Sequence, residues 1–148
     1  MESLVWINGE IQSLSEAKVS LEDRGYQFGD GVYEVIRFYN SCPFALGLHL
    51  DRLYNSATAI RINNPFTAVE MTNAIIDLIN KCGYSEGNIY MQLTRGQARR
   101  DHLFPEAPRP VLVIYLREME ALKTPKDVSP ISTITVPDER WMNCYIKT

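Results

Sequence analysis

Hydrophobic and polar positions change their spacing along the chain, and these changes predict both strands and helices. Residues 4–7 and 10–13 flank an Asn8-Gly9 pair. Both central positions of a two-residue hairpin turn need positive φ, which Asn-Gly accommodates, so this stretch predicts a β-hairpin. Segments rich in β-branched and aromatic residues predict further strands at 32–39, 88–94 and 111–116, with a short returning strand at 44–46.

Two segments instead repeat their apolar residues at helical spacing. The first runs from Leu50 to Ile60 and is followed by Asn63-Asn64-Pro65, which stops a helix. The second starts at Thr67, has a glutamate three residues later in a capping-box pattern, and continues as an apolar stripe until Gly83.

The remaining segments are irregular and divide the chain. DRGYQFGDG, at 23–31, holds three glycines and predicts turns with close backbone approach. The pattern as a whole predicts an α+β fold: a small domain over 1–120 with a mostly antiparallel sheet and two main helices. A linker over 121–130 follows, and residues 131–148 begin a second, truncated domain whose first strand is predicted at 131–136.

Composition narrows the classes of partner. The chain has 148 residues, 45% of them hydrophobic, and a net charge of −3, which does not favour nucleic acid or a membrane surface as a partner. The start has neither a basic nor a long apolar segment, so we expect no signal peptide and no membrane span. Three scattered cysteines and two histidines without metal-site spacing indicate no metal and a reducing, cytoplasmic compartment.

Lys147 is the first candidate for chemistry, because it lies in an apolar stretch at the end of the chain. A lysine that loses its hydration loses proton affinity and becomes a nucleophile. The segment alone favours a lysine that faces solvent. Arg52, on the first predicted helix, can anchor a phosphate by paired hydrogen bonds; the alternatives are a pair with Asp51 or a solvated arginine.

Arg100 and His102 lie two residues apart in the polar loop at 96–110. In an extended segment they point to the same side and form a receptor for a carboxylate; the alternative is a solvated basic loop. Tyr33, on the predicted strand after GDG, either adds a hydroxyl to such a receptor or packs as an ordinary aromatic. Arg140, beside Trp141, can stack on that ring or form an ion pair.

Four segments together resemble a known family. DRGYQFGDGVYEVIR at 23–37, HLDRLYNSA at 49–57, IYMQLTRGQARRDHLFP at 89–105 and RWMNCYIKT at 140–148 resemble the class IV aminotransferases, and among them the branch acting on D-amino acids. That family uses pyridoxal 5′-phosphate, which stabilises a carbanion at the amino acid's Cα.

The resemblance implies a role for each candidate. Lys147 stands where the family's lysine bonds to pyridoxal phosphate and moves the proton at Cα. Arg52 stands where an arginine binds the cofactor phosphate, and Arg140 where another lies near the cofactor. The substrate carboxylate is implied to bind Tyr33, Arg100 and His102.

The resemblance also implies what the whole protein does. We expect transamination of D-amino acids to 2-oxo acids by a full-length homodimer about twice this length, of which this chain is the amino-terminal part. Two other branches of the family stay open, branched-chain aminotransferase and aminodeoxychorismate lyase. A non-catalytic domain that associates with itself through exposed apolar residues is the alternative from another class.

Overall fold

One six-stranded antiparallel sheet and three helices make up the computed structural model, which describes residues 3–121, 130–137 and 145–148. The strands run in the spatial order β2-β1-β6-β5-β3-β4. Their bounds are β1 Leu4–Ile7, β2 Glu10–Ser13, β3 Gly31–Tyr39, β4 Cys42–Pro43, β5 Gly87–Thr94 and β6 Val111–Glu118. The helices are α1 Arg24–Phe28, α2 Leu46–Ala59 and α3 Ala68–Cys82. The expected α+β architecture is confirmed.

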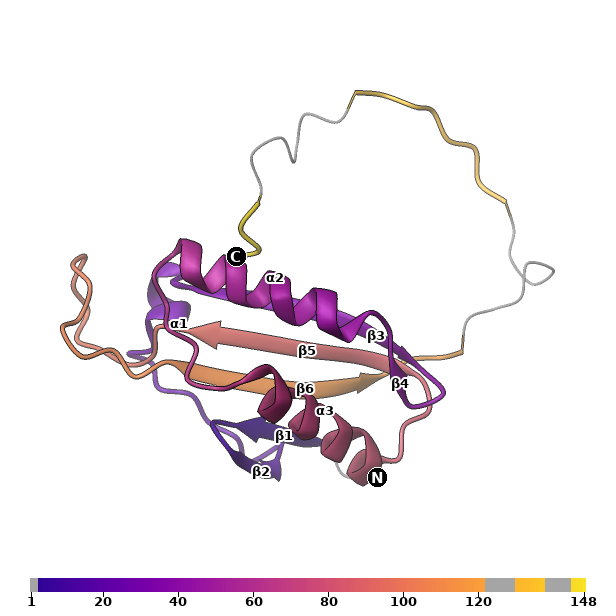
Figure 1. The fold of residues 1–148 in the computed structure, drawn as a ribbon, viewed down its shortest axis with the longest axis horizontal. Coiled ribbons are helices and arrows are strands. Elements are labelled where there is room, and N and C mark those ends of the chain that lie inside the picture. Colours follow the sequence, from indigo (N-terminus) through magenta and orange to yellow (C-terminus); the bar gives the residue numbers. More distant parts are fainter. Residues whose placement is uncertain (1–2, 122–129, 138–144) are drawn as a thin grey trace.

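The core lies between one face of the sheet and the two long helices. Figure 1 shows α2 and α3 crossing the same face of the sheet. Side chains alternate along a strand, so every second residue of β3 faces the helices, including the fully buried Val32, Ile36 and Phe38. The opposite face of the strand carries Tyr33 and Arg37, which are only half-buried.

The hairpin and α3 form as their local chemistry predicts. Asn8 and Gly9 both take positive φ, 48° and 106°, and β1 pairs with β2 across them. Thr67 caps α3, and its side chain and that of Glu70 each accept a backbone N–H of the other, as a capping box requires. These predictions are confirmed.

The glycine-rich stretch contains a helix that the pattern did not predict. α1 spans five residues; the Asp23 side chain accepts a hydrogen bond from the Gly25 N–H, and Gly29 ends the helix with φ 66°. The expected close approach is confirmed at Gly31, where a Cβ would lie 2.8 Å from the carbonyl oxygen of Leu93 on β5. A short helix held by caps has too few residues for a periodic signal.

Two strand predictions differ from the structure. The returning strand is β4, Cys42–Pro43, and not 44–46, because Ala45 turns the chain with φ 53° and α2 begins one residue later. Residues 130–137 contain no strand, and Ile131 and Ile134 are 84% and 87% exposed. A strand needs a neighbour for its backbone groups, and no described strand pairs with this segment. Most of the predicted linker lies outside the described residues.

Candidate active site

Residues 145–148 return to the start of β3. The short β4 pairs only with Phe38 and Tyr39, so the edge beside the first half of β3 is open. The Tyr33 N–H donates to the Lys147 carbonyl oxygen at 3.0 Å, and the Thr148 hydroxyl donates to the Gly31 carbonyl at 2.8 Å. These contacts bring the last residues against the strand that carries Tyr33.

Lys147 is held from the helix side as well. Its N–H donates to the hydroxyl of Ser56, a buried residue of α2, at 3.2 Å, and the neighbouring Ile146 packs against the core. The side chain is half-buried, and Nζ lies 4.4 Å from the centroid of the Tyr33 ring. That distance is typical of a cation–π contact. Lys147 therefore lies at the edge of the sheet with its amine on an aromatic ring.

Two further tyrosines continue from the Tyr33 ring across the sheet face that α2 and α3 leave uncovered. Tyr33 stacks on Tyr90 at 6.0 Å, and Tyr90 contacts Tyr115 at 5.1 Å between ring centroids. Burial, with smaller contributions from Tyr115 and Tyr33, raises the pKa of the Tyr90 phenol. The Tyr90 hydroxyl therefore stays protonated around neutral pH, and it donates a hydrogen bond to Gln92.

Arg52 forms a paired ion bridge with a buried carboxylate on β3. Its Nε and Nη2 donate to the two oxygens of Glu34 at 2.5 and 2.7 Å, and Glu34 is 0% exposed. His49 Nδ1 lies 2.7 Å from the same carboxylate. Arg52 thus pairs with Glu34 and not with Asp51, the alternative considered from the sequence. Its own side chain is 50% exposed, so the guanidinium is fixed on one side and open on the other.

The pKa values follow from this arrangement. Burial alone would raise the pKa of Glu34, but hydrogen bonds and charge from Arg52 and His49 bring it below its ordinary value. The bridge in turn raises the pKa of Arg52, first through the hydrogen bond from its guanidinium to Glu34. Both groups are therefore charged at neutral pH, which suits a fixed receptor for an anion.

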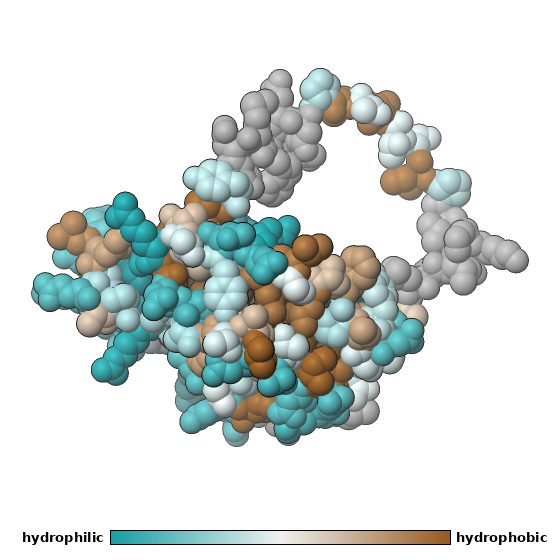
Figure 2. Space-filling view, viewed as in Figure 1, coloured by the Kyte–Doolittle hydropathy of each residue, from teal (hydrophilic) through white to brown (hydrophobic). Residues whose placement is uncertain are grey.

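Arg100 and His102 lie together in the 96–110 loop, which projects from the end of the sheet (Figure 1). Hydrophilic side chains gather at this end of the molecule (Figure 2). The Arg100 guanidinium lies 5.0 Å from the Phe28 ring centroid, and the His102 ring lies 5.6 Å from it. The two side chains thus share one aromatic neighbour.

The structure brings some predicted site residues together and leaves others apart. Lys147 and Tyr33 are in contact, and Arg52 lies on α2, the helix whose Ser56 binds Lys147. Among the described residues, no hydrogen bond or ring contact joins Tyr33 to Arg100 or His102. Arg140 lies outside the described residues.

Sequence reasoning missed Glu34 and His49 as partners of Arg52. A signal for Glu34 was present: it occupies the helix-facing register of β3, whose other members are apolar. A carboxylate in such a register needs a charged partner, since burying it alone is very unfavourable. Ser56 gives the same kind of signal on the buried face of α2.

The structure also bears on membrane spans and metal sites. No helix of the described residues combines the length and apolar character that a membrane span requires. No group of three or more potential metal-binding side chains occurs in residues 3–121, 130–137 and 145–148.

Comparison with known proteins gives a family and several curated relatives, among them two D-alanine aminotransferases. The family profile for amino-transferase class IV matches residues 31–148. The D-alanine aminotransferase of Bacillus licheniformis is 40% identical over 144 residues, which cover 97% of this chain and 50% of that protein. The D-alanine aminotransferase of Staphylococcus haemolyticus is 40% identical over 147 residues, which cover 97% of this chain and 51% of that protein. The chain spans about half the length of these curated relatives.

Solved structures resemble the same region. A branched-chain amino acid aminotransferase of T.th., solved with pyridoxamine 5′-phosphate, superposes with a TM-score of 0.76 at 29% identity. The match covers 86% of this chain and 43% of that one. The branched-chain amino acid aminotransferase from Escherichia coli also has a TM-score of 0.76, at 24% identity over 80% of this chain and 42% of its own, and so supports the fold alone.

Proposed function

The chain belongs to the class IV aminotransferases, and we propose that it supplies the lysine-bearing part of a site that transaminates D-amino acids with pyridoxal 5′-phosphate. In this proposal the full-length protein is a homodimer, and an amino acid and a 2-oxo acid are its substrates. The D-alanine aminotransferases named above support the choice of branch.

One observation carries the proposal. The backbone of Lys147 forms hydrogen bonds with Tyr33 and Ser56, and its Nζ lies 4.4 Å from the Tyr33 ring centroid. A lysine in this position is half-buried and next to the strand that also bears Glu34, the partner of Arg52. The amine of Lys147 thus lies beside β3, and the guanidinium of Arg52, which is carried by α2, is fixed by a residue of the same strand.

The donor set fits pyridoxal phosphate. The cofactor has an aldehyde, which an amine such as Lys147 can bond, and a phosphate, which a guanidinium binds by paired hydrogen bonds. Glu34 orients Arg52, and half of the Arg52 side chain stays exposed to bind an anion. Arg140 is proposed as a further cofactor contact on the resemblance alone. When bound, the cofactor supplies the electron sink for charge that develops at Cα.

The residues of this chain would then act on the amino acid in defined ways. Lys147 would take the proton from Cα and later return it, as a general base and acid. Tyr33, Arg100 and His102 would bind the carboxylate. Holding the carboxylate determines which face of Cα the lysine reaches, and so which enantiomer reacts.

The test is a cofactor-trapping experiment on the 148-residue chain. We would mix the chain with pyridoxal phosphate, reduce with borohydride, and map the modified lysines by mass spectrometry. We expect an adduct on Lys147 that Lys147→Ala abolishes and Lys81→Ala does not. Lys81 is the matched control, because it lies on the exposed surface of α3 in an ion pair with Asp77. Equal labelling of both lysines would contradict the assignment of Lys147.

A branched-chain aminotransferase is the second candidate, because the T.th. structure that resembles this chain carries that name. The two are separated by initial rates of the full-length protein with D-alanine and with L-leucine as amino donors. A preference for L-leucine would refute the D-amino-acid branch, and turnover of neither would favour the lyase of the family.

A domain that only associates with itself is the candidate from another class. Ile131, Ile134 and Tyr145 are 84%, 87% and 79% exposed, and exposed apolar residues favour association. Light scattering on the 148-residue chain tests this: a monomer at high concentration would exclude self-association as its role.

A further inference from the structure

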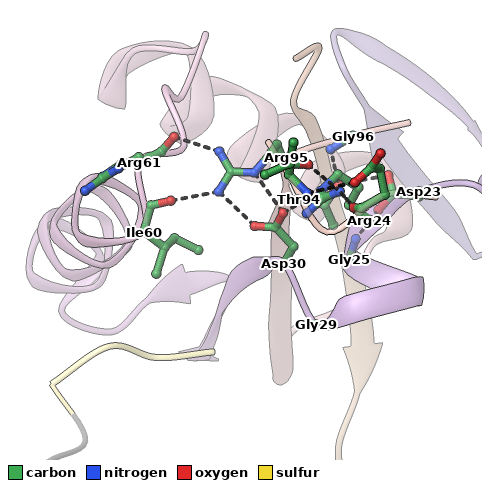
Figure 3. A network of polar contacts seen from close by, with 12 residues as sticks. Asp23, Arg24, Gly25, Gly29, Asp30, Ile60, Arg61, Thr94, Arg95 and Gly96 are labelled. Atoms are coloured by element: carbon green, nitrogen blue, oxygen red, sulfur yellow. Dashed lines mark hydrogen bonds and ion pairs between the residues drawn. The ribbon is translucent and has the colours of Figure 1, made fainter. Parts of the chain in front are cut away.

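A carboxylate that is 10% exposed, Asp30, joins three segments that carry or border proposed site residues (Figure 3). It accepts hydrogen bonds from Arg24 Nε at 2.7 Å and from Arg95 Nε and Nη2 at 2.8 and 2.9 Å. We call Arg24, Asp30 and Arg95 the Asp30 cluster. Arg24 belongs to α1, Asp30 precedes β3, and Arg95 follows β5 where the 96–110 loop begins.

The cluster binds the end of α2 through Arg95. Its Nη1 and Nη2 donate to the carbonyl oxygens of Arg61 and Ile60, each at 2.8 Å. These carbonyls follow the last turn of α2, the end of a helix that favours positive charge. Arg95 also lies 4.0 Å from the ring centroid of Phe104, in the second half of the loop.

Arg24 binds the loop on both sides of His102. Its Nη1 donates to the carbonyl oxygen of Asp101 at 2.6 Å and to that of Leu103 at 3.3 Å. The same guanidinium lies 4.7 Å from the centroid of Phe28, the ring that also contacts Arg100 and His102. The buried Arg24 side chain therefore contacts the backbone on both sides of His102. It also contacts the Phe28 ring, which is the shared neighbour of both proposed carboxylate ligands.

Burial constrains the charges of the Asp30 cluster. Arg24 and Arg95 are 4% and 3% exposed, so their charges need partners throughout. Burial opposes ionisation of Asp30, but hydrogen bonds from Arg95 and Arg24 lower its pKa, so the carboxylate stays charged at neutral pH. The two guanidiniums exceed the one carboxylate by a unit of charge, and the carbonyl oxygens that they contact on α2 and the loop solvate that excess.

We propose that Arg24, held by Asp30, is a positioning residue that fixes Arg100 and His102 for the substrate carboxylate. This rests on the proposed function, in which those two residues bind the substrate. Arg24 itself touches no substrate; it acts by holding the loop backbone and the Phe28 ring at a set place relative to β3.

The first test does not depend on activity. The chain has two histidines, so their ring NMR signals are readily assigned, and His49, held by Glu34, is an internal reference. In Arg24→Met we expect the His102 ring signals to lose the shift caused by Phe28, while those of His49 stay unchanged. Arg24→Lys keeps the charge but places all its donors on one nitrogen, whereas Arg24 binds Asp30 through Nε and the two carbonyls through Nη1. We therefore expect the same direction of change.

A matched control and a second variant complete the test. Arg99→Ala removes an exposed arginine from the same loop and should leave both histidine signals unchanged. If Arg24→Met does not fold, Asp30→Asn removes the charge that orients Arg24 at almost unchanged volume and should shift His102 in the same way. His102 signals identical to those of the parent in the folded variants would overturn the proposal.

The second readout is steady-state kinetics of the full-length protein with D-alanine. Arg24→Lys should raise KM by about tenfold to a hundredfold, the range for one or two weakened charged hydrogen bonds, with kcat changed much less. A loss in kcat with KM unchanged would contradict a positioning role. If no transamination occurs in the parent, the proposed function fails, whereas the histidine signals still decide whether Arg24 holds the loop.

Discussion

Glu34→Gln tests whether the buried carboxylate organises Arg52. The substitution keeps the size of the side chain and removes its charge. Glutamine can accept one hydrogen bond from Arg52, but its amide group then faces Nη2, also a donor. His49 Nδ1 is left as the remaining group that can accept from that amide. The variant therefore loses the paired bridge and keeps the surrounding core.

The structure sets the size of the effect. Two hydrogen bonds between charged groups, at 2.5 and 2.7 Å, join Glu34 to Arg52. A hydrogen bond to a charged group contributes ~1.5–3 kcal/mol when both partners are buried. Half of the Arg52 side chain is exposed, so water replaces part of what is lost. We expect the free energy of unfolding to fall by about 2 kcal/mol in total at neutral pH.

The assay is urea unfolding of the 148-residue chain, followed by circular dichroism over a range of pH. A loss of this size lowers the urea midpoint by about 1 M. The pKa of Glu34 lies below its ordinary value of 4.5 when folded, so its stabilisation is complete above that pH. It is lost as the pH falls below 4.5 through the folded value. The difference between parent and variant should therefore shrink in acid.

Asp77→Asn is the matched control. It breaks an ion pair with Lys81 on α3 that is about as short, but both side chains are about half exposed, so the loss should stay below about 0.5 kcal/mol. A Glu34→Gln loss no larger than that of the control would refute the reasoning. So would a difference between parent and variant that does not change with pH.

Three further predictions concern Arg100 in the 96–110 loop, the cap of α3, and Gly96 at the start of the loop. Arg100→Ala in the full-length protein should raise KM for D-alanine about tenfold or more, and an unchanged KM would remove Arg100 from the substrate site. Thr67→Ala should lower the free energy of unfolding by about 1 kcal/mol in urea titrations, since the capping box with Glu70 is lost; no change would mean that the cap contributes nothing. Gly96→Ala should destabilise the chain by about 3 kcal/mol or more, because φ is 89° and the new Cβ would lie 1.8 Å from the Arg109 carbonyl oxygen. A melting temperature equal to that of the parent would contradict the Gly96 prediction.

Local chemistry is enough to predict most of the elements. The Asn8-Gly9 turn, the Thr67 cap and the Gly83 stop depend on residues a few positions apart, and each forms as expected. The strands β3, β5 and β6 follow from β-branched and aromatic content. The predictions that differ from the structure include two short elements: α1 has five residues, and β4 has two. Their signal is too brief for periodicity, so caps and neighbours decide them.

Residue type and spacing were enough to identify the family motifs and the candidate residues, because they carry the chemistry of an amine, a guanidinium and a carboxylate receptor. The partners of these residues depended on the fold. Glu34 meets Arg52 across 18 positions and Asp30 meets Arg95 across 65. Lys147 reaches Ser56 across 91. Contacts over such separations form only when the sheet and helices pack, since a buried charge pairs with whichever opposite charge that packing brings within reach.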